Sequence, residues 1–309
     1  MSDRYQQLIN TPIGKVVSKQ IGLPAPERLE RYERGQPVIS GPVLLGAAQG
    51  GRLIGPIANV LGAIDAEVHS WLHDEVRGAM ADADIGAKVF EPEVYPEQTF
   101  KALVFDATGI SDSTQLHAAW EFFHPTIRKV RRSSRVIVLG TPPEDCGSPP
   151  EAVAQRALEG LTRSLAKEVR KGASSQLLYV APRAEGRIES TLRFFLSPKS
   201  AYVSGQVVRI RPGTATANGI DWERPLAGKI ALVTGASRGI GESIAEVLDP
   251  RAFKVNLIPY NPTGAFAGSS PKAIDAFEAE LRRAGIPTTV RLTRGRDIAA
   301  ACGQLAAQT

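Results

Sequence analysis

Short apolar runs alternate with longer amphipathic stretches through the first two thirds of the chain. Runs of five or six β-branched and apolar residues favour strands, and apolar residues at three- and four-residue spacing favour helices. The strands predicted in this way are 42–46, 101–106, 135–140, 175–180 and 206–211. The helices predicted between them are 113–130, 150–172 and 185–196, after a polar helical lead-in over about 3–34. This alternation is typical of a doubly wound parallel sheet.

The alternation stops at a linker and then restarts. Residues 212–219 are rich in Pro, Gly and Thr, which favours a loop, and we extend the linker to 212–228. The elements predicted beyond it are strand 230–234, helix 238–248, strand 254–259, helix 271–284 and strand 288–292. This βαβαβ order is half of a dinucleotide-binding fold and leaves one sheet edge open. We therefore expect a first domain over 1–211 and a truncated nucleotide-binding unit over 229–309.

Composition narrows the class of protein. A chain of 309 residues with 43% apolar residues can fill the cores of about two domains. The sequence has no apolar run of about 18 residues and no apolar secretion signal at its start, so we expect a soluble, cytoplasmic protein without a membrane partner. The net charge of +5 permits a nucleic-acid partner without requiring one, and we expect none.

The two cysteines limit the metal chemistry of the chain. Cys146 and Cys302 lie far apart and form neither a CxxC nor a CxxxCxxC motif. This spacing argues against a disulfide framework, a zinc site and an iron–sulfur cluster. We expect no metal site, and we expect Cys146 to lie in a loop.

A glycine-rich loop follows the first strand of the second unit. The segment Thr234-Gly-Ala-Ser-Arg-Gly-Ile-Gly241 has the spacing of a phosphate-binding loop between a strand and a helix. Its glycines would allow the tight turn, the approach of backbone to a pyrophosphate and close helix packing, and Arg238 would suit a 2′-phosphate. The residues expected to bind the dinucleotide are Thr234, Gly235, Ser237, Arg238, Gly239, Ile240 and Gly241.

Several segments in order resemble the short-chain dehydrogenases. They are 154–168, 179–182, 194–208 and 222–235. Residues 1–248 as a whole resemble the high-molecular-weight 3-oxoacyl-[acyl carrier protein] reductases of that family, in which an inert flavodoxin-like domain precedes the reductase domain. The resemblance implies an α/β, flavodoxin/Rossmann-like doubly wound parallel sheet followed by a truncated βαβαβ half-Rossmann unit. It also implies an NAD(P) cofactor and an acyl thioester substrate.

The first domain departs from the family's catalytic pattern. The family protonates the developing alkoxide with a tyrosine whose acidity a lysine raises, and Glu151 and Gln155 align with those two residues. Thr141 aligns near the family's serine, and the loop 45–52 lacks the Gly-x-x-x-Gly-x-Gly spacing. We therefore expect an inert first domain that serves in docking or homo-oligomer formation.

The unit after the linker also departs from a complete reductase. The expected second strand ends at residues 259–261 without the acidic residue that would hold the cofactor's ribose. The strands that would carry a tyrosine–lysine pair do not follow Gly241. The sequence therefore predicts a reductase that is catalytically incomplete.

The segment from about residue 254 onward resembles a different family. Residues 255–264 and 291–305 are similar to the C-terminal segment of the radical S-adenosylmethionine enzymes that methylate C2 of adenine in ribosomal and transfer RNA. The resemblance implies that Asn261 contacts S-adenosylmethionine and that Cys302 carries the methyl group on its sulfur. The three cysteines that hold a [4Fe–4S] cluster are not in this chain, so we expect neither the cluster nor S-adenosylmethionine as working cofactors. The join between the two resemblances lies at about 248–254.

Three functional hypotheses remain. The first is an NAD(P)-dependent 3-oxoacyl thioester reductase, and the second is a fragment of an RNA adenine-C2 methyltransferase. The third is a non-catalytic oligomerisation or docking module. Among other residues, we expect Trp120, Phe122 and Phe123 to belong to the core, and we interpret His69 and His73 as surface residues that bind no metal.

Overall fold

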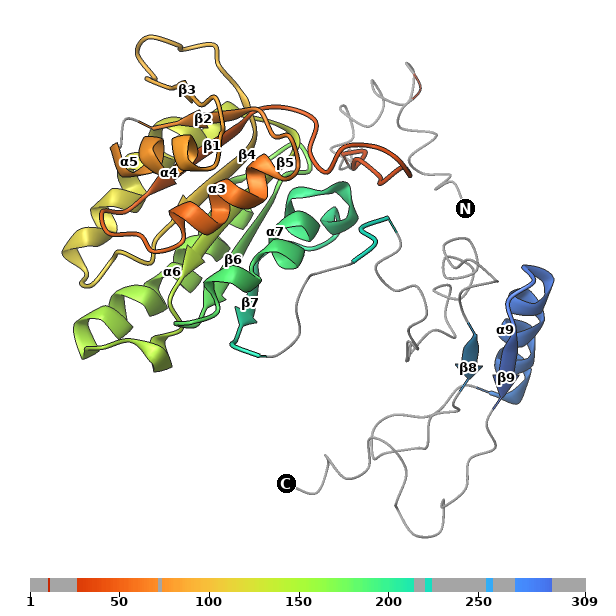
Figure 1. Ribbon diagram of the computed structural model, residues 1–309. Helices are drawn as coiled ribbons and strands as arrows, with labels where there is room; N and C mark the ends of the chain where they lie inside the picture. The colour runs from red at the N-terminus through yellow and green to blue at the C-terminus, as the bar shows by residue number, and fades with distance from the viewer. Residues whose placement is uncertain are drawn as a thin grey trace, which may run out of the picture. The chain divides into compact units, whose positions relative to one another are not determined.

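The computed structural model describes residues 11, 27–71, 74–213, 220–223, 254–257 and 270–290. The chain divides into two compact units, Met1–Asn218 and Gly219–Thr309. The first unit is an α/β fold built on one sheet, and the described part of the second unit is a strand–helix–strand unit (Figure 1).

The sheet of the first unit has seven parallel strands in the order β3-β2-β1-β4-β5-β6-β7. The strands are β1 (Val43–Ala47), β2 (Val68–Ser70), β3 (Lys88–Val89), β4 (Phe100–Asp106), β5 (Val130–Gly140), β6 (Ser174–Val180) and β7 (Gln206–Ile210). Five of them confirm the strands predicted from the apolar runs. The short strands β2 and β3 were not predicted, because two or three residues are too few to show a pattern.

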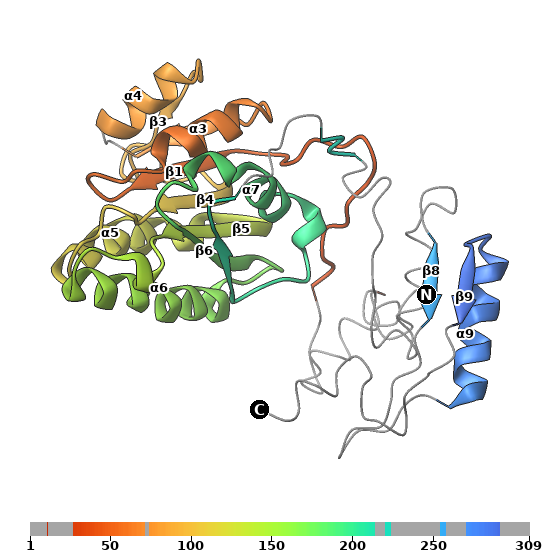
Figure 2. The same cartoon turned by 60° about the horizontal axis from the view of Figure 1, so that its bottom comes forward.

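Helices cover both faces of the sheet, as a doubly wound fold requires (Figures 1 and 2). One face carries α3 (Ile54–Gly62), α4 (Asp74–Asp82) and α7 (Glu189–Leu196), and the other carries α5 (His117–Thr126) and α6 (Pro149–Glu168). The 3₁₀ turns are η1 (Thr114–Leu116), η2 (Ile127–Lys129), η3 (Pro143–Asp145), η4 (Glu185–Arg187) and η5 (Pro198–Ser200). The predicted doubly wound sheet is therefore confirmed.

Alternating side chains of the strands divide the interior into two cores. In β5, Ile137 and Leu139 face α3, α4 and α7, whereas Val136 and Val138 face α5 and α6. The central strands are buried on both faces, which explains their nearly continuous apolar runs. Gly46 of β1 leaves the space that the ring of Phe122 occupies, so a side chain at this position would collide with it.

Three predictions about the first unit were wrong in detail. Residues 27–34 of the lead-in are not helical. Trp120 lies outside the core with 56% of its surface exposed, although Phe122 and Phe123 are buried as expected. The predicted helix 185–196 is a 3₁₀ turn followed by α7, and α3 and α4 were not predicted. In α5, Trp120 lies two positions before Phe122, so the helix turns Trp120 toward solvent while Phe122 and Phe123 face the sheet.

The second unit contains a parallel strand pair joined by a helix. β8 (Val255–Leu257) pairs with β9 (Thr288–Val290), and α9 (Pro271–Arg283) connects them. Ser270 caps α9 by accepting a hydrogen bond from Ala273 N at 3.3 Å. These elements agree with the predicted strands and helix at the same positions. The predicted strand 230–234 and helix 238–248 lie outside the described residues.

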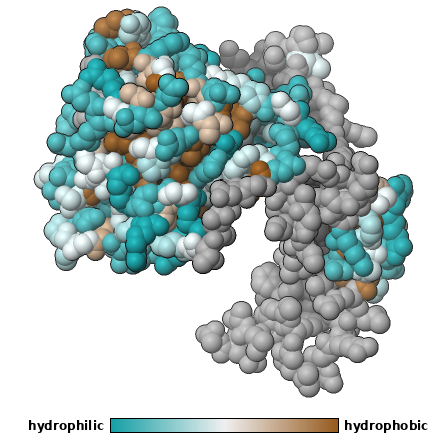
Figure 3. All heavy atoms as spheres, in the orientation of Figure 1, coloured by the Kyte–Doolittle hydropathy of each residue, from teal (hydrophilic) through white to brown (hydrophobic). Residues whose placement is uncertain are grey.

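The described surface is mostly polar. In the view of Figure 3, apolar side chains gather where α3 and α7 lie over the sheet, and polar residues surround them. Among the described residues, no helix has both the length and the apolar character needed to span a bilayer.

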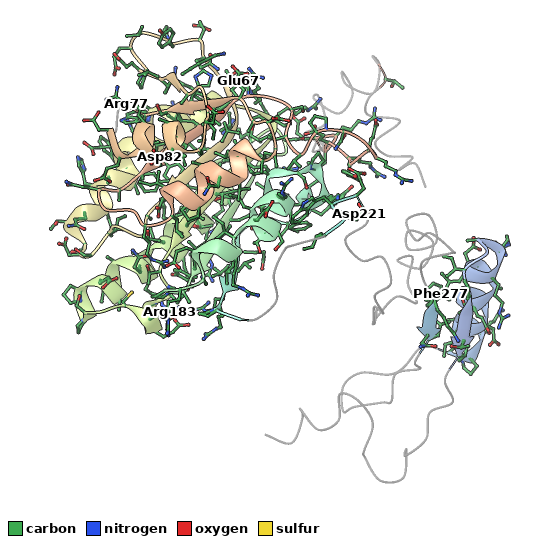
Figure 4. The ribbon with its side chains drawn as sticks, in the orientation of Figure 1. Glu67, Arg77, Asp82, Arg183, Asp221 and Phe277 are labelled. Atoms are coloured by element: carbon green, nitrogen blue, oxygen red, sulfur yellow. The ribbon has the colours of Figure 1, made fainter. Side chains whose placement is uncertain are left out.

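His69 gives the first unit a pH-dependent stability. Its ring is 6% exposed, lies edge-on to Phe100 at 5.5 Å and reaches Glu67, labelled in Figure 4, at 3.4 Å. Burial lowers the pKa of His69, and Glu67 opposes that shift only in part. The interpretation of His69 as a surface residue is therefore wrong.

We expect the free energy of unfolding to fall as the pH drops through the range between about 7 and 5. The unfolded chain takes up a proton on His69 near the ordinary histidine pKa of about 6.5, whereas the folded chain resists protonation. Through this one group, the free energy of unfolding changes by at most about 1.4 kcal/mol per pH unit. Urea unfolding at several pH values measures it. His69→Gln should reduce the slope and His124→Gln, at an exposed position, should not; equal slopes in all three proteins would contradict the assignment.

Candidate functional site

The carboxyl ends of β1 and β4 mark the place where a doubly wound sheet normally binds its ligand. The strand order reverses here, because the chain leaves β1 toward one face and β4 toward the other. The loop 48–53 connects β1 to α3, and the loop 107–110 follows β4. In dinucleotide-binding folds, the amides of the first loop and the start of the helix bind the pyrophosphate.

Two amides at the start of α3 are bonded to side chains at the end of β4. Leu53 N donates to Asp106 Oδ2 at 2.7 Å, and Arg52 N donates to Thr108 Oγ1 at 2.9 Å. The Asp106 carboxylate therefore occupies the anion position at the helix N-terminus.

The two preceding amides are also bonded within the chain. Gly51 N donates to the carbonyl of Ala48 at 3.0 Å, and Gly50 N donates to Glu75 Oε2 at 3.1 Å. Four successive amides of the loop, from Gly50 to Leu53, thus have partners other than a ligand.

Asp106 is fully buried and holds both loops together. Besides Leu53 N, it accepts hydrogen bonds from Thr108 N at 3.0 Å and from Thr108 Oγ1 at 2.7 Å. Burial raises its pKa, while these hydrogen bonds and Arg52 oppose the shift. The three donors compensate for the cost of removing the carboxylate from water.

The two loops pack in direct contact. A Cβ atom at Gly109 would collide with the carbonyl oxygen of Gln49, and one at Gly51 would lie 2.7 Å from Asp106 Oδ2. The absence of side chains at Gly51 and Gly109 permits this contact, which closes the space between the loops.

The side chain of Arg52 crosses the carboxyl ends of the neighbouring strands. Its guanidinium pairs with Glu185, donates to the carbonyl of Val180 and lies 3.4 Å from Thr141 Oγ1. Because the two charged side chains are about one quarter exposed, the pair lies at the mouth of the site. The Arg52 side chain therefore occupies the region beyond β5 and β6 toward which a cofactor would extend.

Gln155 of α6 ties three parts of the site together. Its Oε1 accepts from Thr141 N at 2.8 Å, and its Nε2 donates to the carbonyls of Ala107 and Ile110 at 2.8 and 2.9 Å. The Tyr179 hydroxyl donates to the backbone carbonyl of Gln155 at 2.8 Å. Every polar atom of the Gln155 side chain is thus used in holding the strand ends and the loop after β4 in place.

Glu151 and Cys146 have local roles at the start of α6. Glu151 Oε2 accepts from Gly147 N at 2.9 Å, and Ser148 caps the helix through Glu151 N at 3.4 Å. Burial and the nearby Glu151 raise the pKa of Cys146 to about 12, so its sulfur stays a thiol at neutral pH. Cys146 lies beyond the 3₁₀ turn Pro143–Asp145, where a loop residue was predicted.

The four amides of Gly50 to Leu53 at this end of the sheet are all bonded within the chain. Glu151 and Gln155, which the resemblance to the reductases aligns with that family's tyrosine and lysine, make structural hydrogen bonds. Thr141 lies beside them, where its backbone amide bonds Gln155. The residues present do not fit a dinucleotide between β1 and β4.

Asp106 and Arg52 were not predicted to belong to this site. Asp106 could have been found from the sequence, because it is an aspartate at the end of an apolar strand, and the loop 45–52 has lost its glycine spacing. Arg52 could not be placed from sequence, because its contacts with Val180 and Glu185 join segments that are far apart in the chain.

The residues predicted to bind a dinucleotide, Thr234, Gly235, Ser237, Arg238, Gly239, Ile240 and Gly241, lie outside the described residues. Asn261 and Cys302, assigned by resemblance to S-adenosylmethionine and methyl transfer, also lie outside them. Within the described ranges, no group of three or more His, Cys, Asp or Glu side chains could hold a metal ion.

No protein-family model matches the chain. Part of the chain is similar in sequence to proteins named "Probable dual-specificity RNA methyltransferase RlmN". The relative from Frankia casuarinae is 48% identical over 89 residues, which are 28% of this chain and 21% of the relative. The relative from Saccharopolyspora erythraea is 59% identical over 56 residues, which are 18% of this chain and 15% of the relative. The chain thus spans about one fifth of the length of the curated relatives it matches.

Solved short-chain dehydrogenases give matches of low identity. A Serratia marcescens short-chain dehydrogenase/reductase mutant is 13% identical, with a TM-score of 0.47 over 57% of this chain and 98% of that chain. BdcA in complex with NADPH is 16% identical, with a TM-score of 0.47 over 56% of this chain and 94% of that chain. With TM-scores below 0.5, these matches add nothing to the fold that the strand order defines.

We expect Gly109→Ala to destabilise the first unit by about 1–3 kcal/mol, because its Cβ would push the loop 107–110 away from Gln49. Gly55→Ala in α3 is the matched control. Nothing lies within 4 Å of its Cβ position, and alanine favours a helix by up to about 1 kcal/mol. Urea unfolding of both variants measures the difference. A Gly109→Ala protein as stable as the parent would contradict the close packing of the two loops.

Proposed function

We propose that the first unit is a non-catalytic assembly module that keeps a reductase-like fold as a scaffold and joins two copies of the chain. The observation that carries this proposal is the internal bonding of the loop after β1. Four of its successive amides, Gly50 to Leu53, are already hydrogen-bonded within the chain.

A pyrophosphate could bind here only by displacing the Asp106 carboxylate. The displacement would break the bonds from Leu53 N and both donors of Thr108 and would leave a buried charge without partners. Each such bond to a charged group contributes about 1.5–3 kcal/mol. The folded unit therefore favours its own carboxylate over an added anion.

The residues beside the cleft do not supply the acid that carbonyl reduction needs. Hydride transfer requires a proton donor at the developing alkoxide. Gln155 cannot carry a charge, and its amide group is fully used by Thr141, Ala107 and Ile110. The Tyr179 hydroxyl donates to a backbone carbonyl, and burial raises its pKa.

The outer face of α5 and α6 offers a surface for a second copy. Trp120 is 56% exposed and stacks between His117 and His124, with ring centroids 5.3 and 4.7 Å away. Val153 of α6 is 65% exposed, and Gly160 has nothing within 4 Å of its Cβ position. Tryptophan is among the residues that most often anchor a protein–protein contact, so the exposed Trp120 supports the packing of a second copy on this face.

We expect the full chain to sediment as a dimer and to oxidise no NADPH in the presence of acetoacetyl thioester. Trp120→Glu combined with Val153→Glu should give a monomer, because two buried carboxylates would face each other across the contact. Val94→Glu, at a position that is also 56% exposed, is the matched control and should remain a dimer. Analytical ultracentrifugation and NADPH absorbance measure the two properties.

A monomeric parent chain would contradict the assembly role. NADPH-dependent turnover above the blank would contradict the non-catalytic role and restore the reductase hypothesis. In that case the cofactor loop 234–241 would be the first place to search for the binding residues.

A second candidate function is a contribution to RNA adenine methylation, which the sequence similarity to the RlmN proteins supports. The resemblance assigns contact with S-adenosylmethionine to Asn261 and the methyl-carrying sulfur to Cys302. The residues present do not fit a [4Fe–4S] cluster, because the cluster of this family is held by three cysteines and this sequence has two cysteines in all. The cluster would have to be held by cysteines that are not in this sequence.

On this second candidate, the full chain should bind S-adenosylmethionine in equilibrium dialysis, and Asn261→Ala should weaken the binding about tenfold through loss of one strong hydrogen bond. Asn256→Ala in β8 is the matched control, because Asn256 bonds Thr289 instead. Absence of binding by the parent chain would exclude this candidate.

A further inference from the structure

A groove lies at the end of the sheet opposite to the cleft described above. It forms where residues 27–36, drawn in red in Figure 1, pass the amino ends of β4 and β5, and its volume is about 520 Å³. This size is within the range of small-molecule sites. The charged lining residues are the cations Arg28, Arg31, Lys101 and Arg132 and the carboxylates Glu30 and Glu33.

Contacts with the sheet fix the segment in place. Glu30 N donates to Ser133 Oγ at 3.2 Å, and Lys101 Nζ pairs with Glu30 Oε2 at 2.5 Å. Arg132 Nε bonds Glu27 Oε2 at 3.0 Å. Ser133 has a positive φ of 52°, at the irregular start of β5 where its register with β4 shifts. The strand irregularity thus shapes the floor of the groove.

The ion pairs leave part of the positive charge uncompensated. Lys101 is neutralised by Glu30, and Arg132 is neutralised by Glu27. Arg28 and Arg31 line the groove and form no ion pair within the part of the chain that the structure describes. Glu33, the remaining carboxylate of the lining, forms no ion pair among the described residues either. Two guanidinium groups therefore face one carboxylate, and the groove keeps a net positive charge that favours an anion.

A buried amide donor lies in the same wall. The Gln36 side-chain nitrogen is buried without a hydrogen-bond partner. Gln36 lines both the groove and an adjoining cavity of about 30 Å³. A buried donor without a partner is destabilising, and an acceptor from a ligand would satisfy it.

A second buried donor lies behind the groove. Arg135 is 2% exposed, and its Nε and Nη2 have no hydrogen-bond partner, while Nη1 is 3.5 Å from Ser174 Oγ. Arg135 follows the groove residue Ser133 by two positions and pairs in register with Ala102, the neighbour of Lys101. Burial lowers its pKa, and the negative charge of Glu30 favours its charged form. A buried guanidinium without a full set of partners places a strong positive field at the groove.

We propose that this groove binds a small phosphomonoester. Arg28 and Arg31 contact the phosphate, Gln36 Nε2 donates to a ligand oxygen, and Arg135 attracts the negative charge from behind. The volume accommodates a phosphorylated sugar. This function is independent of the proposed assembly role, because the groove and the outer face of α5 and α6 share no residue.

Ribose 5-phosphate, ribose and inorganic phosphate are the probes, tested on the full chain at constant ionic strength. We expect ribose 5-phosphate and phosphate to raise the melting temperature and ribose to leave it unchanged. Arg28→Gln combined with Arg31→Gln should weaken the binding of ribose 5-phosphate at least about tenfold in equilibrium dialysis. Arg77→Gln in α4, an exposed position labelled in Figure 4, is the matched control and should bind like the parent.

Arg135→Met provides a second, structural readout. The unliganded variant should be at least as stable as the parent, because a buried cation with unsatisfied donors is removed, and its stabilisation by ribose 5-phosphate should be lost. No effect of either phosphate probe on the parent would overturn the proposal. Equal binding by the Arg28/Arg31 double variant would also overturn it.

Discussion

The carboxyl end of the sheet in the first unit is organised by the hydrogen bond that the amide of Leu53, at the N-cap of α3, donates to the Asp106 carboxylate. A helix N-terminus at the switch point of a parallel sheet attracts an anion, and this chain supplies that anion from its own fourth strand. Once Asp106 is buried there, Thr108 must orient toward it and the loop at Gly109 must lie against the loop after β1. The place where a doubly wound sheet normally binds its ligand is thus an element of stability in this unit.

The two ends of the sheet differ in how completely their buried charged and amide groups are hydrogen-bonded. At the carboxyl end, the charged and amide groups of Asp106 and Gln155 have their donors and acceptors matched within the fold, and the neutral hydroxyl of Ser70 is buried there without a partner. At the amino end, Arg135 and Gln36 have buried nitrogen atoms without partners. Folded proteins rarely retain such groups without a reason, so the unmatched end is where a ligand has the most to contribute.

The sheet could be predicted from sequence because its central strands are buried on both faces and appear as continuous apolar runs. The strand at 135–140 is an example, since four successive residues from Val136 to Leu139 are fully buried. The short strands β2 and β3 could not be predicted, because two or three residues show no pattern. The orientation of Trp120 could not be predicted either, because it depends on which face of α5 meets the sheet. The eroded loop at 45–52 was identified, whereas the hydrogen bonds that replaced its ligand required the packing of segments more than fifty residues apart.

The bonding of Gln155 makes its position sensitive to substitution. A lysine there could still donate to the carbonyls of Ala107 and Ile110, but it would leave the amide of Thr141 without an acceptor and would bring a charge into a fully buried position. Loss of the Asp106 carboxylate would likewise leave Leu53 N and both donors of Thr108 without an acceptor. These positions are therefore interdependent, and a substitution at one of them would be tolerated only together with changes at its partners.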